Sequence, residues 1–231
     1  MTRCSRPARF HRVRFGWPLL AVLAAGPVAL AGTPIEERAP ADPAGQVEVS
    51  NTAGSVVITA WPRNEVEVTG TLGEGTERLE FSSSGKLTRV KVVLPRQSSR
   101  VEGTALVLKV PAGSGLAVNT ISADVTAAGV RGSQRLQSVS GNIHTEAAAE
   151  DVECKTVSGD VKVKGSGQPG LLTVTTVSGD ADLSRVAGEV NGNTVSGNFA
   201  VAMGDTSRTR LRSTSGDLGL RRRLTPDARG G

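Results

Sequence analysis

Thr156-Val157-Ser158-Gly159-Asp160 is one of six similar phrases that divide the chain between Leu116 and Leu220. The other five phrases are Thr120–Asp124, Ser138–Asn142, Thr176–Asp180, Thr194–Asn198 and Ser213–Asp217. The fourth position of the phrase recurs at steps of 18, 18, 20, 18 and 19 residues, and it is held by Ala123, Gly141, Gly159, Gly179, Gly197 and Gly216. A period of this length predicts a repeat protein in which each repeat contacts its neighbours.

The length and composition of the repeat predict β-structure. A period of 18 to 20 residues is too short for a helix pair or a propeller blade. Each repeat contains a strand-like run, a Gly-Asp or Gly-Asn turn and a second short strand. We therefore expect an all-β fold, and specifically a β-solenoid with one coil of about 18–20 residues per repeat.

Alternation before each phrase predicts one interior face and one solvated face. In the third repeat Cys154, Thr156 and Ser158 share one face, whereas Glu153 and Lys155 share the other. The Thr and Ser columns are therefore expected inside, with their hydroxyl groups paired along the ladder. An unpaired buried hydroxyl would cost about 1–3 kcal/mol.

A column of apolar residues in the second position of the phrase interrupts this alternation. Its members are Ile121, Val139, Val157, Val177 and Val195. Either a bend turns them inward at a corner, or they form an exposed stripe that could contact a partner. We favour the corner, because a large exposed apolar patch is uncommon on a monomer.

The pivot glycines are predicted to hold the turns of the repeats. They are Gly141, Gly159, Gly179, Gly197 and Gly216. We expect them to adopt backbone conformations that alanine or valine resists.

Residues 1–31 have the pattern of a signal peptide. Five arginines precede an apolar run that ends in Ala29-Leu30-Ala31, which is a small-x-small cleavage pattern. The chain has 27 Lys and Arg against 22 Asp and Glu, so removal of the five signal-peptide arginines leaves a net charge of zero. We therefore expect an exported protein that binds no nucleic acid and is not an integral membrane protein after cleavage.

The remaining chain is expected to form one domain. We interpret residues 32–45 as a flexible leader, 46–224 as a single β-solenoid domain and 225–231 as a disordered tail. Within the domain, residues 46–111 are expected to form irregular coils and residues 112–220 the regular Ser-Gly-Asp/Asn repeats. A separate small antiparallel domain over 46–111 is the alternative.

The sequence offers little for catalysis. After cleavage His144 is the single histidine and Cys154 the single cysteine, so neither a nucleophile–histidine arrangement nor an internal disulfide is expected. Equivalent carboxylates in tight turns do not build the differentiated acid–base pair of a glycosidase. We expect no enzyme activity and no cofactor.

Metal binding is a weak alternative for the last position of the phrase. Asp160 and Asp180 occupy this position in successive repeats and could share calcium through oxygen ligands. Asp or Asn after Gly also stabilises tight turns through its own side chain. We favour the structural explanation for the whole column.

The C-terminal end of the repeats is basic. Arg221, Arg222 and Arg223 follow the last strand-like run. Charge at the end of a repeat array prevents further chains from adding, and we favour a solvated cap. Contact with anionic lipid headgroups is the alternative.

The phrases resemble a known bacterial family. Asn51–Ile58, Leu108–Gly113 and the serial Val-Ser-Gly-Asp phrases are similar to the candidate-adhesin, β-strand-repeat family classed as domain-of-unknown-function family 4097. The resemblance implies an exported or envelope-associated protein, with some relatives linked to envelope-stress regulation. It implies no catalytic residues.

We therefore expect a non-catalytic, adhesin-like β-solenoid that acts as a monomeric binding or structural module at the bacterial cell envelope. Its partner would be an envelope protein, a glycan or a lipid, and the periplasm is favoured over the cell surface or secretion. An envelope-stress regulatory component is the first alternative. A polysaccharide-active β-helix enzyme is the second.

Overall fold

The computed structural model describes residues 32–95, 102–147, 150–203 and 208–222. The predicted signal peptide over 1–31, the predicted tail over 225–231 and Arg223 lie outside the described residues. The compact unit of the chain that includes the described residues spans Ala31–Gly231, and only its described parts are discussed below.

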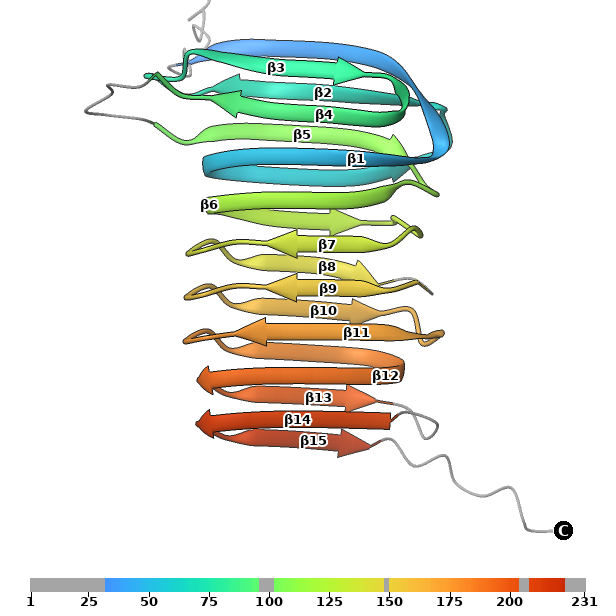
Figure 1. Cartoon of the computed structure of the whole chain (residues 1–231), viewed down its shortest axis with the longest axis vertical. Coiled ribbons are helices and arrows are strands. Elements are labelled where there is room, and N and C mark those ends of the chain that lie inside the picture. Colours follow the sequence, from blue (N-terminus) through green and yellow to red (C-terminus); the bar gives the residue numbers. More distant parts are fainter. Residues whose placement is uncertain (1–31, 96–101, 148–149, 204–207, 223–231) are drawn as a thin grey trace, which may run out of the picture. The chain divides into compact units, whose positions relative to one another are not determined.

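Every regular element in the described ranges is a β-strand, which confirms the all-β prediction. These ranges contain no helix that is long and apolar enough to span a membrane. Figure 1 shows the strands, which are β1 (Thr33–Trp61), β2 (Glu65–Leu72), β3 (Arg78–Ser83), β4 (Gly85–Val93), β5 (Thr104–Pro111), β6 (Gly115–Ala128), β7 (Gln134–Gln137), β8 (Ile143–Ala147), β9 (Val152–Lys155), β10 (Val161–Gly165), β11 (Pro169–Thr176), β12 (Ala181–Ser196), β13 (Phe199–Met203), β14 (Arg208–Ser215) and β15 (Leu218–Arg222).

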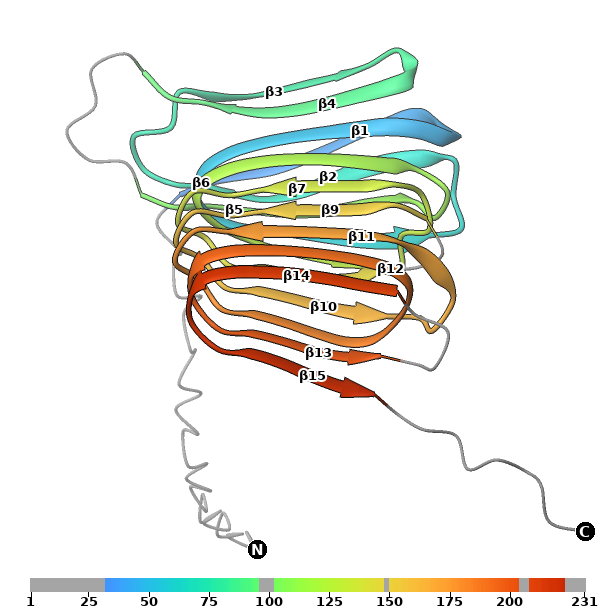
Figure 2. The ribbon, with the colours of Figure 1, turned by 60° about the horizontal axis from the view of Figure 1, so that its bottom comes forward.

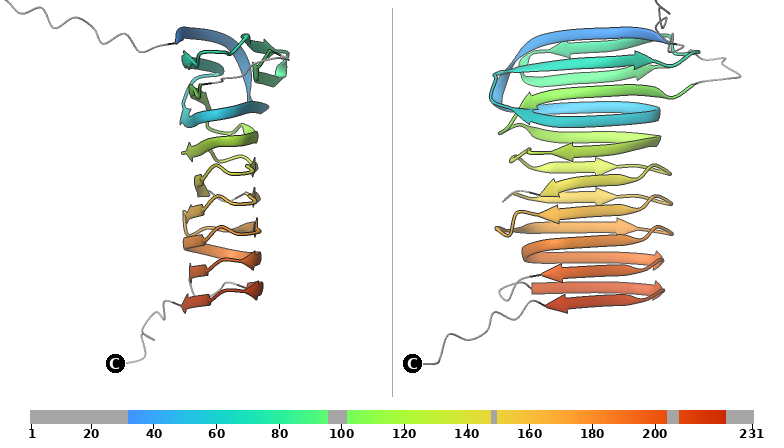
Figure 3. Two further views of the ribbon diagram at one scale, coloured as in Figure 1. Left: turned by 90° about the vertical axis from the view of Figure 1, so that its left-hand side faces the viewer. Right: turned by 180° about the vertical axis from the view of Figure 1, so that it is seen from behind.

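From β6 onward, each strand pairs in parallel with its equivalent in the next repeat. In one row β6, β7, β9, β11, β12 and β14 follow one another, and Cys154 pairs with Val174. In the other row β6, β8, β10, β12, β13 and β15 follow one another, and Val161 pairs with Ala181. Views from the side and from behind show the two rows as facing layers (Figure 3).

The core lies between these layers because alternate strand residues point inward. Leu116, Leu136, Val174 and Leu183 are among the fully or almost fully buried side chains. Phe199 is 1% exposed and finds space because Gly192 has no side chain: a Cβ atom at Gly192 would lie 2.6 Å from the Phe199 ring. The thin core is therefore filled by complementary residue sizes.

The N-terminal part has mixed pairing around the long strand β1. Residues 46–59 of β1 pair in parallel with β6, and residues 54–61 also pair in parallel with β5. β2 pairs antiparallel with both β1 and β5. β3 and β4 form an antiparallel hairpin at this end, shown clearly in Figure 2.

The expected flexible leader over 32–45 is wrong, because β1 begins at Thr33. Residues 33–40 pair antiparallel with β2, although they include Pro34 and Pro40. Among the described strands, residues 33–40 pair with β2 along one side, and their other side is an edge of the sheet. Proline is compatible with such an edge because its missing N–H group can face away from the ladder.

Glu67 ties the strands of this N-terminal part together. Its carboxylate pairs with Arg38 Nε and with Lys109 Nζ, both at 2.7 Å, and its side chain is 6% exposed. The hydrogen bond from Lys109 and the charges of both partners hold the pKa of Glu67 below its ordinary value. Lys109 Nζ also lies 5.5 Å from the ring centroid of Trp61, a geometry that permits a cation–π contact.

The turn glycines stack closely on one another. A Cβ atom at Gly159 would collide with the carbonyl oxygen of Gly141, and one at Gly179 would collide with that of Gly159. Among the five pivots only Gly197 and Gly216 have positive φ, at 159° and 129°. Our expected conformational reason is therefore wrong for Gly141, Gly159 and Gly179, where close backbone packing excludes a side chain.

We expect Gly159→Ala and Gly159→Val to lower the free energy of unfolding by about 2 kcal/mol or more, since the added Cβ must displace backbone. Chemical denaturation measures this change. The exposed Ser158 provides a matched control, and Ser158→Ala should alter stability by less than about 0.5 kcal/mol. Equal effects at the two positions would contradict the close stacking.

Candidate functional site

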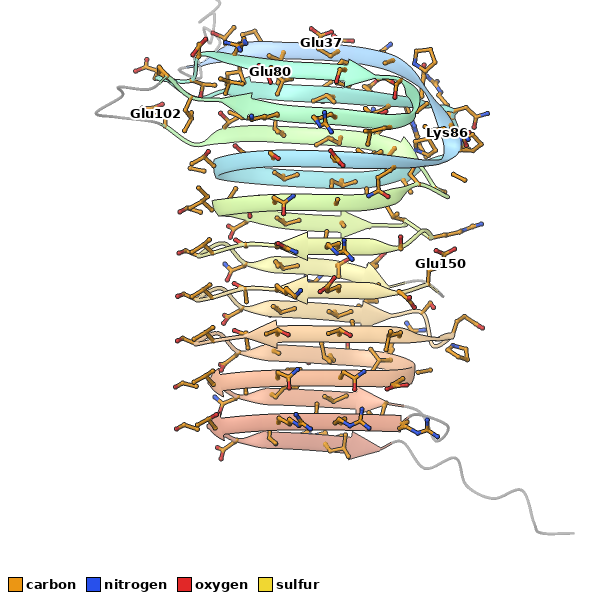
Figure 4. All side chains as sticks on the ribbon, in the orientation of Figure 1. Glu37, Glu80, Lys86, Glu102 and Glu150 are labelled. Carbon is orange, nitrogen blue, oxygen red and sulfur yellow. The ribbon has the colours of Figure 1, made fainter. Side chains whose placement is uncertain are left out.

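The phrases of the repeats form one edge of the described structure, where the chain passes from one layer to the other. One set of side chains projects from each repeat at this edge, on the left of Figure 4. The edge presents three parallel columns, one apolar, one of serine and one of Asp and Asn. We refer to this surface as the phrase edge.

The apolar column of the phrase edge is exposed, so the favoured corner interpretation is wrong. Its exposed fractions range from 40% to 52%, at Ile121, Val139, Val157, Val177 and Val195. The chain turns at the phrase, and two consecutive residues, Val157 and Ser158, both face outward. Alternation fails there because Thr156 and Gly159 line the inner side of the bend.

Backbone hydrogen bonds hold the apolar column in line. Ser158 N donates to Val139 O at 2.9 Å, and Ser178 N donates to Val157 O at 2.8 Å. Each column residue therefore lies directly beside its equivalent in the next repeat. At the usual interstrand spacing of about 4.8 Å, the column extends over about 19 Å.

The first position of the phrase carries hydroxyl groups, which are buried in Thr120, Ser138, Thr156, Thr176 and Thr194. In Thr156 and Thr176 the hydroxyl group stabilises the turn, whereas Thr194 Oγ1 has no hydrogen-bond partner among the described residues. Gly159 N donates to Thr156 Oγ1 and Gly179 N donates to Thr176 Oγ1, both at 3.0 Å. These bonds lie within a single turn, whereas we expected pairing along the ladder. The expectation that the phrase serines are interior is also wrong, since Ser158 and its equivalents are exposed.

The Asp/Asn column forms a ladder of side-chain-to-backbone hydrogen bonds between repeats. Asp160 N donates to Asn142 Oδ1 and Asp180 N donates to Asp160 Oδ1, both at 3.0 Å. Asp124, Asp180 and Asn198 accept equivalent bonds. Our expectation that each side chain stabilises its own turn is therefore incomplete, because these bonds join neighbouring repeats. The spacing of the phrases predicted that these residues align in a column, but it did not show that each side chain accepts a hydrogen bond from the next repeat.

The weak calcium candidates Asp160 and Asp180 lie within this ladder. One oxygen of each carboxylate already accepts a backbone hydrogen bond. The described ranges contain no group of three or more Asp, Glu, His or Cys residues arranged to hold a metal ion. The ladder gives the column a structural function without a bound ion.

The other candidate reactive groups do not converge on the phrase edge. Cys154 is fully buried, and burial followed by the nearby charge of Glu153 raises the pKa of its thiol to about 12. The thiolate needed for nucleophilic chemistry is therefore very scarce at neutral pH. His144 is exposed on β8, where it pairs with Lys162 of β10.

Two of the hollows lined by described residues lie away from the phrase edge. One, of about 460 Å³, is lined by Arg131, Lys164 and Arg185, together with Glu146, whose carboxylate pairs with Lys164 at 3.2 Å. Arg185 has a φ of 56°, which is uncommon for a residue other than glycine.

The second hollow, of about 620 Å³, includes Glu48, Asp151 and Glu153. Glu48 pairs with Arg89, and Glu153 pairs with Arg135 and Lys155. Hydrogen bonds from Lys155 and Arg135 hold the pKa of Glu153 below its ordinary value. This environment favours a permanently ionised carboxylate, which is unsuited to act as a general acid at neutral pH.

The structure shows a basic row that our C-terminal candidates did not include. Arg221 and Arg222 lie on β15, whereas Arg208, Arg210 and Arg212 form an exposed row on β14. The alternating pattern of these three arginines with Thr209 and Leu211 contained the signal for an outward-facing basic strand.

We expect Asp160→Ala to reduce stability by about 1 kcal/mol, because Asp180 N would lose its side-chain acceptor. Asp160→Asn should retain most of the stability, since Asn142 and Asn198 fill the same role. Thermal denaturation with calcium and with a chelator would measure both effects. Equal losses for Ala and Asn, or a calcium-dependent rise in Tm that Asp160→Asn removes, would contradict the ladder.

Comparisons with solved structures found adhesin candidates. One from Bacteroides fragilis has 13% sequence identity and a TM-score of 0.48, with coverage of 81% of this chain and 97% of the other. One from Parabacteroides distasonis has 13% identity and a TM-score of 0.45, with coverage of 82% and 97%. A candidate cell adhesion protein from Clostridium sporogenes has 9% identity and a TM-score of 0.41, with coverage of 83% and 100%.

A search of curated proteins found no match. The family model described as Toastrack DUF4097 matches residues 44–228. This match includes all six phrases and confirms the resemblance inferred from the sequence. The chain belongs to the Toastrack DUF4097 family.

Proposed function

We propose that this protein is an exported, non-catalytic, adhesin-like module that binds a partner or serves a structural role at the bacterial cell envelope. We further infer a β-solenoid arrangement, in which the exposed phrase edge makes the contact. The proposed partner is an envelope protein with an apolar surface.

The parallel registers support the solenoid. Val125 pairs with Ile143, and Ile143 pairs with Val161, so equivalent residues meet one repeat apart. The chain crosses between the two layers at every phrase and returns to the same position in the next repeat. Each repeat therefore covers the core of its neighbour.

The exposed apolar column is the observation that carries the proposed function. Its five members are all β-branched, and serines occupy the next exposed position in each repeat. Rigid β-branched side chains lose little conformational entropy when they are covered. A straight apolar row without charges in these two columns favours an extended apolar contact.

Protein is the favoured partner because the column lacks the features used for other ligands. It contains no aromatic ring for stacking on sugars or bases and no charge for headgroups. Apolar side chains held in a fixed register match a shaped protein surface. The contact would stabilise the complex mainly through removal of apolar area from water.

The roles of the carboxylates support a non-catalytic module. Asp124, Asp160 and Asp180 of the phrase edge accept hydrogen bonds from the next repeat, and Glu48 and Glu153 in the larger hollow pair with basic side chains. A glycosidase requires two carboxyl groups with different environments and a position for the sugar between them. Asp160, Asp180, Glu48 and Glu153 have structural partners instead.

We expect the labelled protein to co-sediment with bacterial envelope fragments, and Val157→Ser with Val177→Ser to weaken this binding about tenfold. The two substitutions remove apolar area at the middle of the column. Val107→Ser is the matched control, because Val107 is 39% exposed on β5, away from the column. Circular dichroism should show unchanged folding for all variants.

Protease treatment of the fragments should abolish the binding. Binding that persists to protein-free vesicles of extracted lipid would assign the contact to lipid and contradict the proposed partner. Equal binding by the Val157→Ser/Val177→Ser variant and the Val107→Ser control would contradict the role of the column. Turnover of envelope glycans by the pure protein would contradict the non-catalytic function.

A further inference from the structure

The two ends of the repeat stack differ in how their interiors are covered. At the N-terminal end the β3–β4 hairpin packs Leu79 and Phe81 against the core. At the C-terminal end Leu218 and Leu220 of β15 are 45% and 56% exposed. Their equivalents in the preceding repeat, Phe199 and Val201, are 1% and 2% exposed. The last repeat therefore presents core positions to solvent.

The strands of this last repeat also have a free side within the described ranges. β14 pairs with β12, and β15 pairs with β13, and neither strand has a further described partner. A strand edge of this kind is a template for another strand. Addition of a strand would continue the parallel rows of the repeats and cover the interior.

The outward face of β14 specifies the charge of such a strand. Arg208, Arg210 and Arg212 are exposed at every second position. Glu189 of β12 pairs in register with Arg208, and its Oε1 atom lies 4.0 Å from Arg210 Nη1. The register partners of Arg210 and Arg212 are the uncharged Asn191 and Asn193. The three arginines therefore have one acidic neighbour on β12, and the row retains an excess of positive charge.

The inward face of β14 favours apolar residues at the inward positions of an added strand. Leu211 is partly buried against the core, and Thr209 Oγ1 contacts Met203 Sδ at 3.1 Å. Residues placed opposite these positions would lie over the interior that Leu218 and Leu220 leave open. The complementary strand alternates acidic and apolar residues with the period of two that a strand requires.

Neither symmetric pairing with a second copy nor residues 223–231 match this requirement. Symmetric pairing of two β14 strands would bring two arginine rows together, and like charges across neighbouring strands are destabilising. Residues 223–231 contain one acidic residue, Asp227, and one large apolar residue, Leu224. They do not supply the alternating pattern.

We propose that β14 is a β-augmentation site for an extended segment of another protein with acidic and apolar residues in alternation. The acidic side chains pair with Arg208, Arg210 and Arg212, the apolar side chains cover the open interior, and the backbone extends the sheet. This site is separate from the phrase edge and does not depend on its function.

The test is titration of the full chain with a labelled synthetic peptide of alternating glutamate and valine, as long as the 8 residues of β14, by fluorescence anisotropy at about 0.15 M salt. We expect saturable binding. Arg210→Glu with Arg212→Glu should weaken it about tenfold or more. The control Lys162→Glu, an exposed charge reversal on β10, should leave it unchanged.

A charge-reversed pair separates recognition from misfolding. The Arg210→Glu/Arg212→Glu chain should bind a peptide of alternating lysine and valine, which a misfolded variant would not do specifically. Equal binding of a peptide with the glutamates and valines in two blocks would overturn strand addition. Absence of binding by the alternating peptide, or binding of phosphatidylglycerol vesicles in its place, would also overturn the proposal.

Discussion

Close backbone contact between the turns of successive repeats is the constraint on which this structure depends. Gly141, Gly159 and Gly179 approach the carbonyl group of the preceding turn so closely that a Cβ atom has no space. This approach brings each phrase into register with the next. The register then places buried hydroxyl groups, apolar side chains and Asp or Asn side chains in separate columns.

The same constraint determines which side chains support the fold and which remain for contact. Thr156 and Asp160 act on the backbone, the former within its turn and the latter between repeats. Val157 and Ser158 face outward, where they make no contribution to the core. A single short phrase thus supplies both the framework of the edge and a regular exposed surface.

The two proposed contact surfaces use different physics. The phrase edge offers apolar area in a fixed register, so its contact would depend little on salt. β14 offers a free strand edge and a row of arginines, so its contact would weaken as salt screens the charges. One protein could therefore hold two partners at once, along its edge and at its C-terminal end.

The period of the phrases was sufficient to predict the all-β class, the alternation that precedes a phrase such as Thr156–Asp160, and the burial of Cys154. The predicted alternation of inward and outward side chains failed at Val157 and Ser158, because a bend places these two consecutive residues on its outer side. The sequence also could not show β1 over the expected leader, since pairing with β2 depends on residues far along the chain. The acceptors of the Asp and Asn side chains likewise became visible only when adjacent repeats were in place.

The six phrases nevertheless identified the residues that compose the candidate edge. Their spacing aligned Ile121 with Val139 and the later valines, whereas local sequence did not establish their exposure. The basic row on β14 was detectable as Arg-Thr-Arg-Leu-Arg over 208–212. Its importance required the position of β14 at the end of the stack, which depends on the whole fold.

The most direct test of the account is a distance between repeats, measured by pulsed electron paramagnetic resonance. Spin labels would be attached at Ile121→Cys and Val195→Cys in a chain whose Cys4 and Cys154 are replaced by alanine. Four parallel steps of about 4.8 Å predict a single distance near about 19 Å, broadened by the label linkers. A dominant distance beyond about 35 Å, well outside four interstrand spacings, would contradict the in-register stack.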